Sequence, residues 1–394
     1  MTPLAVSACT MVSALGHGLA ATRAALQAGR SGLAPQPFET ATLPTWLGLV
    51  QGLDTVAPPA GLAEWDCRNN RLAQATLQAD GFAAAVQATC ERVGPARIGV
   101  FLGTSTSGIL STEQAYRRRD VVTGALPADL HYASTHNTGS LARYVRQVLA
   151  LQGPAAVVST ACSSSAKVFG QAARLIELGL IDAAVVGGVD SLCLTTLYGF
   201  HSLELLSPDI CRPWDRRRKG LSLGEAGAFL LLERACATPQ GWLLGCGESS
   251  DGHHMSSPLP DGAGAALAMR QALRQAGLNA GDVDYVNLHG TGTPGNDSAE
   301  DRAVTTVFGT HTPCSSTKGH TGHTLGAAGG VEAVIALLAL QHGLMPGGLN
   351  ADEPDPTLRA AYLHGTRHTP LRHVASNSFG FGGSNCCLLF GAGA

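Results

Sequence analysis

Charged and aromatic residues are scarce in this 394-residue chain. Asp, Glu, Lys and Arg make up 14% of it and Phe, Trp and Tyr 5%, whereas charged residues average about 25% of a globular protein. Disorder is excluded, because disordered chains are poor in apolar residues and this chain is 45% hydrophobic. With a formal net charge of −3, the chain has no overall positive potential that would attract nucleic acid. So little charge predicts much buried surface, in a thick layered fold, a subunit interface, or both.

Signals for export, membrane insertion and metal or disulfide frameworks are also missing. The apolar N-terminal segment has no basic residue before Arg23, so it lacks the positive region of a signal peptide. No apolar run continues for the roughly 18 residues that a membrane helix needs. The 11 cysteines include no Cys-x-x-Cys pair, which indicates buried thiols in a reducing compartment. We expect a cytoplasmic protein that binds neither nucleic acid nor membranes.

Short apolar strands alternate with Ala- and Leu-rich helical segments, as is typical of α/β folds. Several of the strands are apolar without alternation, which indicates that both of their faces are covered. The clearest predicted strands are 97–104, 155–160, 182–190, 242–248, 284–289, 373–378 and 385–390. The clearest predicted helices are 165–178, 265–276 and 330–342.

The chain shows one seam and a weak internal repeat across it. Apolar periodicity stops at residues 233–241, so we predict halves at 1–235 and 236–394. On each side, a segment (157–180 and 312–344) runs from a strand through a Cys/Ser/Thr-rich turn into a helix and ends at Gly-Leu. This repeat favours a pseudo-twofold fold built from two similar βα halves.

Cys162 stands in S-T-A-C-S-S-S, between an apolar strand and a helix. A thiol at a helix N-terminus lies at the positive end of the helix dipole, which favours the thiolate. The thiolate is the form that attacks carbonyl carbon atoms, and small neighbours leave room for an incoming carbonyl group. Cys162 is therefore a candidate nucleophile; a buried structural cysteine is the alternative.

Further candidates lie in Gly-rich segments that follow apolar strands. His289 ends the strand in V-N-L-H-G-T-G-T-P, and Lys318, His320 and His323 share the turn S-S-T-K-G-H-T-G-H-T-L-G. Strand ends of this kind display functional groups in α/β sheets. A metal site formed by these histidines with Cys314 is conceivable, but the spacing matches no zinc pattern and lacks a carboxylate. The glycines do not form a phosphate loop, because no G-x-x-x-x-G-K-[ST] occurs.

Seven motifs together resemble the β-ketoacyl-acyl-carrier-protein synthases, condensing enzymes of the thiolase superfamily, in their elongating Cys-His-His form. The resemblance covers nearly the whole chain, with the motifs in the family's order. They are T-A-C-S-S-S (160–165), G-x-x-D-S (187–191), R-P-W-D-R-R-R-K-G-x-x-x-G-E (212–225), D-G-H-H-M-S-S-P (251–258), H-G-T-G-T-P-x-N-D (289–297), T-K-G-H-T-G-H (317–323) and N-S-F-G-F-G-G-S-N (377–385).

The resemblance implies a thiolase-like fold of duplicated βα halves in five α-β-α-β-α layers, and an acyltransferase activity. This is the decarboxylative Claisen condensation of an acyl chain with malonyl-acyl carrier protein, in fatty-acid, polyketide or polyene biosynthesis. Cys162 would carry the acyl chain as a thioester, and His289 and His323 would stabilise the enolate formed on decarboxylation. Lys318 would orient His323 through the local network. The backbone N–H groups of Cys162 and Phe381 would form the oxyanion hole.

Other positions follow from the same resemblance. Thr291 and Thr293 would bind the phosphopantetheine arm, which arrives on the carrier, so the protein would need no cofactor of its own. Phe379 and Gly382 would line the substrate site. Glu332 matches a structural or ion-binding glutamate, and a simple salt-bridged helix carboxylate is its alternative.

The implied partners are an acyl carrier protein and a second, similar subunit in a homodimer or heterodimer. Carriers are acidic, so docking needs a local basic patch; pairing with nearby acids is the alternative use of each basic residue. The candidates are Arg68, Arg71, Arg117, Arg216, Arg217 and Lys219.

Three alternatives are weighed against this function. A thiolase would use a second cysteine, for which the pair Cys386–Cys387 is the candidate. A non-catalytic chain-length partner would lack the nucleophile, whereas Cys162 is present. A Cys-His hydrolase would not need two histidines and a lysine. Departures from the family pattern at L-A-V-S-A-C-T-M-V-S and G-L-S-L-G-E-A-G-A leave the pathway open.

Overall fold

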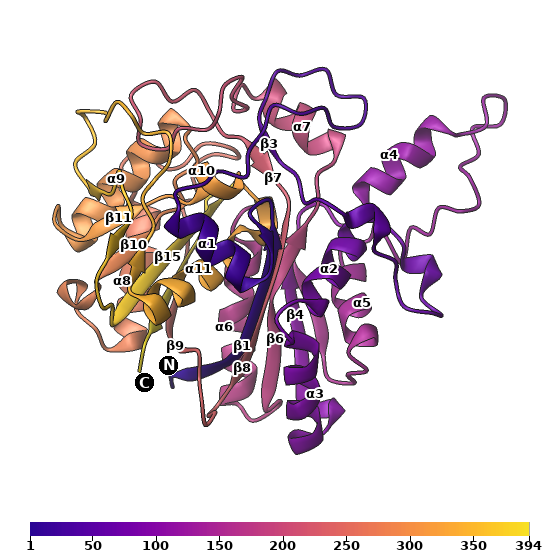
Figure 1. Cartoon of the computed structure of the whole chain (residues 1–394), viewed down its shortest axis with the longest axis horizontal. Coiled ribbons are helices and arrows are strands. Elements are labelled where there is room, and N and C mark those ends of the chain that lie inside the picture. Colours follow the sequence, from indigo (N-terminus) through magenta and orange to yellow (C-terminus); the bar gives the residue numbers. More distant parts are fainter. Residues whose placement is uncertain (394) are drawn as a thin grey trace.

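The computed structural model describes residues 1–393, and its main sheet consists of two similar halves (Figure 1). In spatial order, the first half contains β1 (Leu4–Ser13), β8 (Ala226–Glu233), β6 (Ala183–Asp190), β4 (Ile98–Gly103) and β5 (Ala155–Val158). The second contains β9 (Gly241–Ser250), β16 (Ser384–Gly391), β15 (His373–Gly380), β10 (Tyr285–Asn287) and β11 (Pro313–Ser315), with β13 (Ala361–Tyr362) beside β11. The halves join where β1 pairs with β9 over Leu4–Val6.

The two halves have the same pairing pattern. β8 pairs antiparallel with β1 and β6, and β4 pairs parallel with β6 and β5. Likewise β16 pairs antiparallel with β9 and β15, and β10 pairs parallel with β15 and β11. The repeated βα halves predicted from the sequence are therefore present. The seam at 233–241 falls between β8 and β9, and the assignment of 1–235 and 236–394 as separate domains stays a prediction.

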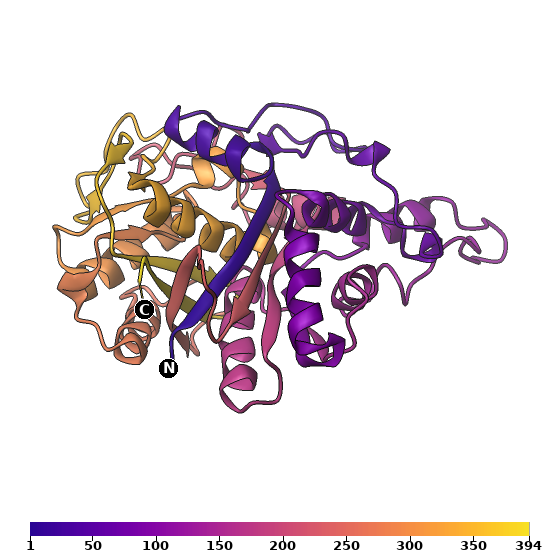
Figure 2. The same cartoon turned by 60° about the horizontal axis from the view of Figure 1, so that its bottom comes forward.

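Helices cover both outer faces of the sheet and also fill the space between its halves, giving five layers. One outer core holds α2 (Arg68–Gln78), α3 (Phe82–Val93) and α5 (Ser140–Val148), and the opposite one holds α8 (Ala263–Ala276) and α9 (Pro294–Phe308). The middle layer contains α6 (Ser164–Glu177) and α11 (Ala328–His342) (Figure 2). This is the layered arrangement that the sequence predicted.

The central helix α11 is buried on every side over Ala328–Leu340. By length and composition alone, Leu325–His342 could cross a membrane, but 89% of this stretch is buried inside the protein. A helix held between the two halves of the sheet has no solvent-facing side, so the apolar composition of α11 follows from its place in the middle layer.

The remaining elements are short or peripheral. The helices are α1 (Leu19–Gln27), α4 (Ile109–Arg117), α7 (Leu194–Ser202) and α10 (Lys318–Thr321), and the strands are β2 (Gly16–His17), β3 (Leu47–Gly48), β7 (Leu223–Gly224), β12 (Leu344–Met345) and β14 (Arg367–His368). In Figure 1, α4 and the loop after it project from the body at the end where β5 forms the edge of the sheet.

Each predicted strand and helix is found, with ends that differ by a few residues. The most consequential difference concerns β10, which ends at Asn287, so His289 lies two residues beyond the strand rather than at its last position. His289 is therefore held by a loop, and other groups must fix its orientation.

Candidate active site

Cys162 lies in a sharp turn between β5 and α6. Ala161 before it has a left-handed backbone (φ 52°), a conformation that costs a non-glycine residue energy and is concentrated at functional sites. The Ser164 hydroxyl accepts a hydrogen bond from the Thr160 N–H at 2.9 Å and donates one to the Ala161 carbonyl oxygen at 2.5 Å. Gly103 on β4 allows close packing, because a side chain there would meet the Ser165 backbone nitrogen at 2.2 Å. These contacts fix the thiol at the start of α6.

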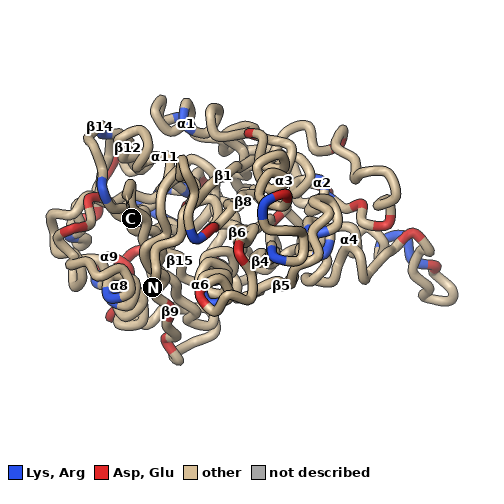
Figure 3. The backbone as a smooth tube through the Cα atoms, turned by 90° about the horizontal axis from the view of Figure 1, so that it is seen from below, with Lys and Arg blue, Asp and Glu red and all other residues tan. Residues whose placement is uncertain are grey.

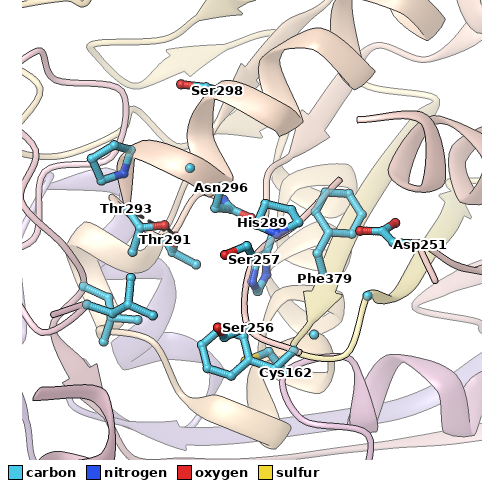
Figure 4. A pocket seen from close by; sticks show the side chains of 18 of the residues that line it. Cys162, Asp251, Ser256, Ser257, His289, Thr291, Thr293, Asn296, Ser298 and Phe379 are labelled. Carbon is cyan, nitrogen blue, oxygen red and sulfur yellow. Dashed lines mark hydrogen bonds between the residues drawn. The ribbon is translucent and has the colours of Figure 1, made fainter. Parts of the chain in front are cut away.

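The thiol and two imidazoles converge from three separate segments. His323 Nε2 lies 2.9 Å from Cys162 Sγ, and the rings of His289 and His323 are 5.3 Å apart and nearly perpendicular. One ligand-type atom from each residue lies within 4.8 Å of the other two. Figure 4 shows Cys162 and His289 facing the same cavity. The structure thus brings together the three residues that the sequence predicted to be catalytic.

Both histidines are neutral in this environment. Burial lowers the pKa of His289 and of His323 well below 6.5, and the nearby Lys318 ammonium lowers them further. A neutral imidazole keeps one N–H donor and one acceptor. Each ring can therefore donate a hydrogen bond to a developing oxyanion without itself carrying charge.

The sequence predicts that Lys318 orients His323. In the structure Lys318 instead contacts His289 and Glu332, and it acts on His323 through its charge alone. Its Nζ donates to Glu332 Oε1 and lies 3.5 Å from His289 Nδ1, at the long limit of a hydrogen bond. An ammonium group can only donate, so Nδ1 is the acceptor and the proton of His289 resides on Nε2. The pair of Lys318 and Glu332 therefore sets the tautomer of His289. Glu332 has the salt-bridged role that was weighed as the alternative to ion binding.

The Cys162 thiol is protonated at rest, contrary to the thiolate expected from its place at the helix start. Burial raises the pKa of this thiol to about 12, although the Lys318 ammonium lowers it in part. Desolvation of the anion outweighs the helix dipole, because a buried unpaired charge costs several kcal/mol, whereas the dipole contributes about 1 kcal/mol. The thiol therefore becomes nucleophilic only as its proton moves toward His323.

The loop that follows β15 lies directly against the nucleophile. A side chain at Gly380 would lie 2.6 Å from the Thr160 carbonyl oxygen and 3.2 Å from the Cys162 nitrogen, so only glycine permits this approach. The Phe381 ring packs on Phe200 of α7 at 5.5 Å, and the Phe379 ring lies 5.7 Å from His289. Phe381 follows Gly380 directly and lines the same cavity as Cys162, and its part in an oxyanion hole stays a prediction.

A cavity of about 500 Å³ leads to the triad. Thr291 and Thr293 line it, and their hydroxyl groups lie 2.9 Å apart. Its walls come from α7, α9, the loop 251–260 and the segment 379–385, and the lining includes Phe379 and Phe381. Gly382 donates its N–H to the Met255 carbonyl oxygen at 2.8 Å, which joins two of these walls. The volume is typical of a small-molecule site.

Sequence analysis missed Glu300, a buried carboxylate behind His289. Its oxygens accept the backbone N–H groups of His289 at 2.8 Å and Gly290 at 2.7 Å, and Asn377 Nδ2 at 3.1 Å. Burial raises the pKa of Glu300 to about 7, against the opposing effect of these hydrogen bonds. Glu300 lies on the buried face of α9, in its second turn. A buried carboxylate needs hydrogen-bond donors, so this position could have indicated a structural role from the sequence.

Asp190 belongs to the motif G-x-x-D-S at 187–191, from which the sequence predicts no role for it. Its buried carboxylate accepts the hydroxyl groups of Thr104 and Thr106 at 2.7 Å, and the backbone N–H groups of Ser105, Thr106 and Gly326 at 2.5 to 2.8 Å. It therefore ties the loop after β4 to the turn that follows His323. The spacing of a motif cannot show such contacts between distant segments.

The considered zinc quartet is not formed. Among residues 1–393, the group able to hold a metal ion is Cys162, His289 and His323, without Cys314 or His320. Both ring nitrogens of His320 are buried and have no hydrogen-bond partner among residues 1–393. Burial lowers the pKa of His320 to about 4. His320 thus does not belong to the cluster of Cys162, His289 and His323.

The predicted docking residues all have acidic neighbours. Arg68 is the most enclosed, because its guanidinium donates two hydrogen bonds to the buried Glu225. Figure 3 shows basic and acidic residues side by side on the projecting end of the molecule. An exposed ion pair stabilises the fold by only about 0–1 kcal/mol, so these basic residues can exchange an acidic neighbour for an acidic group of a carrier protein. Their role in docking stays a prediction. The other pairs are Arg71–Asp66, Arg117–Glu39, Arg216–Glu353, Arg217–Asp215 and Lys219–Asp209.

Comparisons with known proteins cover nearly the whole chain. The family model described as Beta-ketoacyl synthase, N-terminal domain, matches residues 70–237, and Beta-ketoacyl synthase, C-terminal domain, matches 240–352. The chain is 33% identical to 3-oxoacyl-[acyl-carrier-protein] synthase 2 of Vibrio cholerae over 98% of both proteins. It is 41% identical to the mitochondrial 3-oxoacyl-[acyl-carrier-protein] synthase of Arabidopsis thaliana, over 63% of this chain and 58% of that protein.

A solved structure agrees with these matches. It is the complex of a ketosynthase with its chain length factor from Xenorhabdus doucetiae, one chain of which superposes with a TM-score of 0.91. The identity is 38%, and the match covers 99% of this chain and 98% of that one. The two matched family domains include the segments that carry Cys162, His289 and His323. The chain therefore belongs to the β-ketoacyl synthase family of acyltransferases.

Proposed function

We propose that this β-ketoacyl synthase takes an acyl chain onto Cys162 and condenses it with malonyl-acyl carrier protein, with loss of carbon dioxide. One observation carries the assignment of residues: a thiol and two neutral imidazoles meet at one cavity. A condensation needs an electrophilic thioester beside a stabilised enolate, and this arrangement supplies a group for each. The product is a β-ketoacyl chain on the carrier.

In the first half-reaction, Cys162 Sγ attacks the thioester carbonyl of the incoming acyl chain. Its proton passes toward His323 Nε2, 2.9 Å away, and is then available to the departing thiol of the phosphopantetheine arm. The backbone N–H groups of Cys162 and Phe381 would stabilise the oxyanion of the tetrahedral intermediate. The bond from Cys162 Sγ to the acyl carbon forms as the bond from that carbon to the carrier's sulfur breaks.

In the second half-reaction, the malonyl group loses carbon dioxide and its electron pair moves into an enolate. The negative charge collects on the thioester oxygen, where the Nε2–H of His289 donates one hydrogen bond. His323 donates a second in the tautomer that carries its proton on Nε2. The enolate carbon then attacks the acyl carbon on Cys162, and the bond from that carbon to Sγ breaks. The leaving thiolate takes up one proton from solvent, which restores the thiol for the next cycle. Thr291 and Thr293 would hold the arm of the malonyl carrier in the cavity that they line. The protein supplies no cofactor in this scheme.

The thiolase alternative is disfavoured by the position of its second cysteine. Cys386 and Cys387 are buried at 0% and 1% exposure in β16, and neither lines the cavity. The Sγ atom of Cys386 faces that of Cys246 at 3.8 Å, inside the core. The non-catalytic alternative is disfavoured because Cys162 lies beside two histidines. The condensation would serve fatty-acid, polyketide or polyene biosynthesis, and it would take place in the cytoplasm.

The proposed reaction is tested by measuring the intact mass of the enzyme after incubation with a panel of acyl carrier proteins. We expect a mass increase of one acyl group for the preferred chain length, which malonyl carrier then discharges. Because the acyl group is a thioester, hydroxylamine should also remove it. If the mass is unchanged with every acyl carrier, or if malonyl carrier leaves the adduct in place, the condensation is contradicted.

We further propose that the protein forms a homodimer or a heterodimer with a similar subunit. β5 is the edge strand of the main sheet, and an uncovered edge strand readily pairs with another chain. The nearby projecting loop exposes Val121 at 96% and Val122 at 89%, which is unusual for apolar side chains away from an interface. Both features are consistent with a partner at this end of the molecule.

Sedimentation at micromolar concentration checks this association. A dimer of the protein alone supports the homodimer, and a monomer that doubles in mass only with a similar subunit supports the heterodimer. A stable monomer under both conditions contradicts the proposal.

A further inference from the structure

The lining of the cavity includes one solvent-exposed cation, Arg302, that no sequence motif includes. Apart from histidines, the charged side chains in its lining are Asp251 and Arg302. Asp251 is engaged internally, because its carboxylate accepts the Leu259 N–H at 2.9 Å and Asn385 Nδ2 at 2.6 Å. Arg302 is therefore the charged group of the lining that remains free to meet a ligand.

Arg302 differs from the predicted docking residues in having no acidic partner. Its Nη1 donates to the Pro260 carbonyl oxygen at 2.8 Å, which holds the guanidinium between α9 and the loop 251–260, and both of these segments line the cavity. No carboxylate of residues 1–393 lies within 4.0 Å of it, whereas each candidate from Arg68 to Lys219 has one. A guanidinium has five N–H donors, so most of those of Arg302 remain unused.

The position of Arg302 along α9 places it at a definite depth of the cavity. Pro294, Ser298 and Arg302 are four residues apart and all line the cavity, as one face of a helix does. At 1.5 Å per residue, Arg302 lies about 12 Å further along the helix axis than Pro294. Thr291 and Thr293 precede this helix on the inner side. Figure 4 shows the order from Cys162 past Thr291 to Ser298.

A phosphopantetheine arm has a thiol at one end, amides along its length and a phosphodiester at the other end. With its thioester at Cys162 and its amides near Thr291 and Thr293, the arm would bring its single anionic group toward the outer part of α9. We infer that Arg302 binds this phosphodiester. The inference rests on the proposed function, because it requires the arm to enter this cavity. Arginine suits the role, since its planar fork matches a phosphate group.

The inference is tested with three forms of the same acyl or malonyl thioester: pantetheine, 4′-phosphopantetheine and the intact carrier protein. The variant Arg302→Gln keeps a side-chain N–H donor for the Pro260 carbonyl oxygen but removes the charge. We expect the ratio of kcat/KM for phosphopantetheine to that for pantetheine to fall about tenfold, from loss of one charge-assisted contact. The fall in kcat/KM should come from a higher KM for the phosphopantetheine substrate. The kcat/KM of the carrier-bound substrate should fall by a similar factor. Arg274→Gln is the matched control, because Arg274 is exposed on α8 and does not line the cavity.

Three outcomes would overturn the assignment. If pantetheine and phosphopantetheine substrates lose activity equally, Arg302 acts only through its contact with Pro260. If only the carrier-bound substrate is affected, the arginine meets the carrier protein and not the phosphodiester. If Arg274→Gln gives the same change, the effect comes from the lower net positive charge of the protein and not from the position of Arg302. Failure of the proposed function is distinct from these, because the unaltered enzyme would then turn over none of the three substrates.

Discussion

Replacing Cys162 with alanine is expected to bring acyl loading below the limit of detection. Cys162 is the cysteine that lines the cavity, and it lies 2.9 Å from His323 Nε2. Loss of a covalent nucleophile costs hydrolases of similar logic on the order of 10⁶-fold in kcat. Intact-mass analysis after incubation with acyl carrier should show no adduct. The variant should still decarboxylate malonyl carrier, because that step uses the histidines and not the thiol, and this activity demonstrates that it is folded.

The matched control is Cys386→Ala, which removes another buried thiol in the same type of environment. The hydrogen bond with the Cys246 thiol, and then burial, raise the pKa of Cys386, and Cys386 does not line the cavity. This variant should load as the parent enzyme does, apart from some loss of stability from the small void in the core. Peptide mapping should place the adduct of the parent enzyme on Cys162. An adduct on Cys386 or Cys387 would exclude Cys162 as the nucleophile.

The sequence was sufficient for the fold, and the three residues that it predicted to be catalytic lie together in the structure. The repeat of strand, small-residue turn and helix at 157–180 and 312–344 corresponds to β5–α6 and β11–α11, the same two positions in the two halves of the sheet. Parallel neighbours bring the ends of their strands to one edge. His289 and the segment of His323 follow the neighbouring strands β10 and β11, so they could be expected to meet.

The sequence did not define which groups the charged residues contact. Lys318 is five residues before His323 but reaches His289 and Glu332, because the direction of its long side chain depends on the packing of α10 and α11. Burial likewise reversed the prediction for Cys162, since the helix dipole can be expected from a motif but desolvation cannot. The predicted docking residues Arg216 and Arg217 could be located as part of a run of charge. Their pairing with Glu353, 137 and 136 residues away, is visible only in the fold.

Replacing His289 or His323 with alanine is expected to slow malonyl decarboxylation by roughly 10² to 10³, the cost of removing one donor to a developing oxyanion. Burial keeps both rings neutral, and Lys318 leaves the proton of His289 on Nε2. Release of carbon dioxide from malonyl carrier measures this step. Acyl loading should fall less in His289→Ala, because its ring does not contact the thiol. In His323→Ala it should fall further, since Nε2 of His323 receives the Cys162 proton.

His320→Leu is the control for these two variants. His320 lies in the same turn as His323 and is fully buried, but its ring nitrogens have no partner among residues 1–393. Replacing such a group with an apolar side chain of similar size sacrifices no hydrogen bond. Decarboxylation should therefore stay within a few fold of the parent rate once folding is verified by thermal melting. A parent-like rate of decarboxylation in His289→Ala or His323→Ala would contradict the donor role. Of the three histidines, only His289 and His323 line the cavity and can reach the enolate. An equal loss of rate in His320→Leu would therefore assign the effect to disruption of the turn.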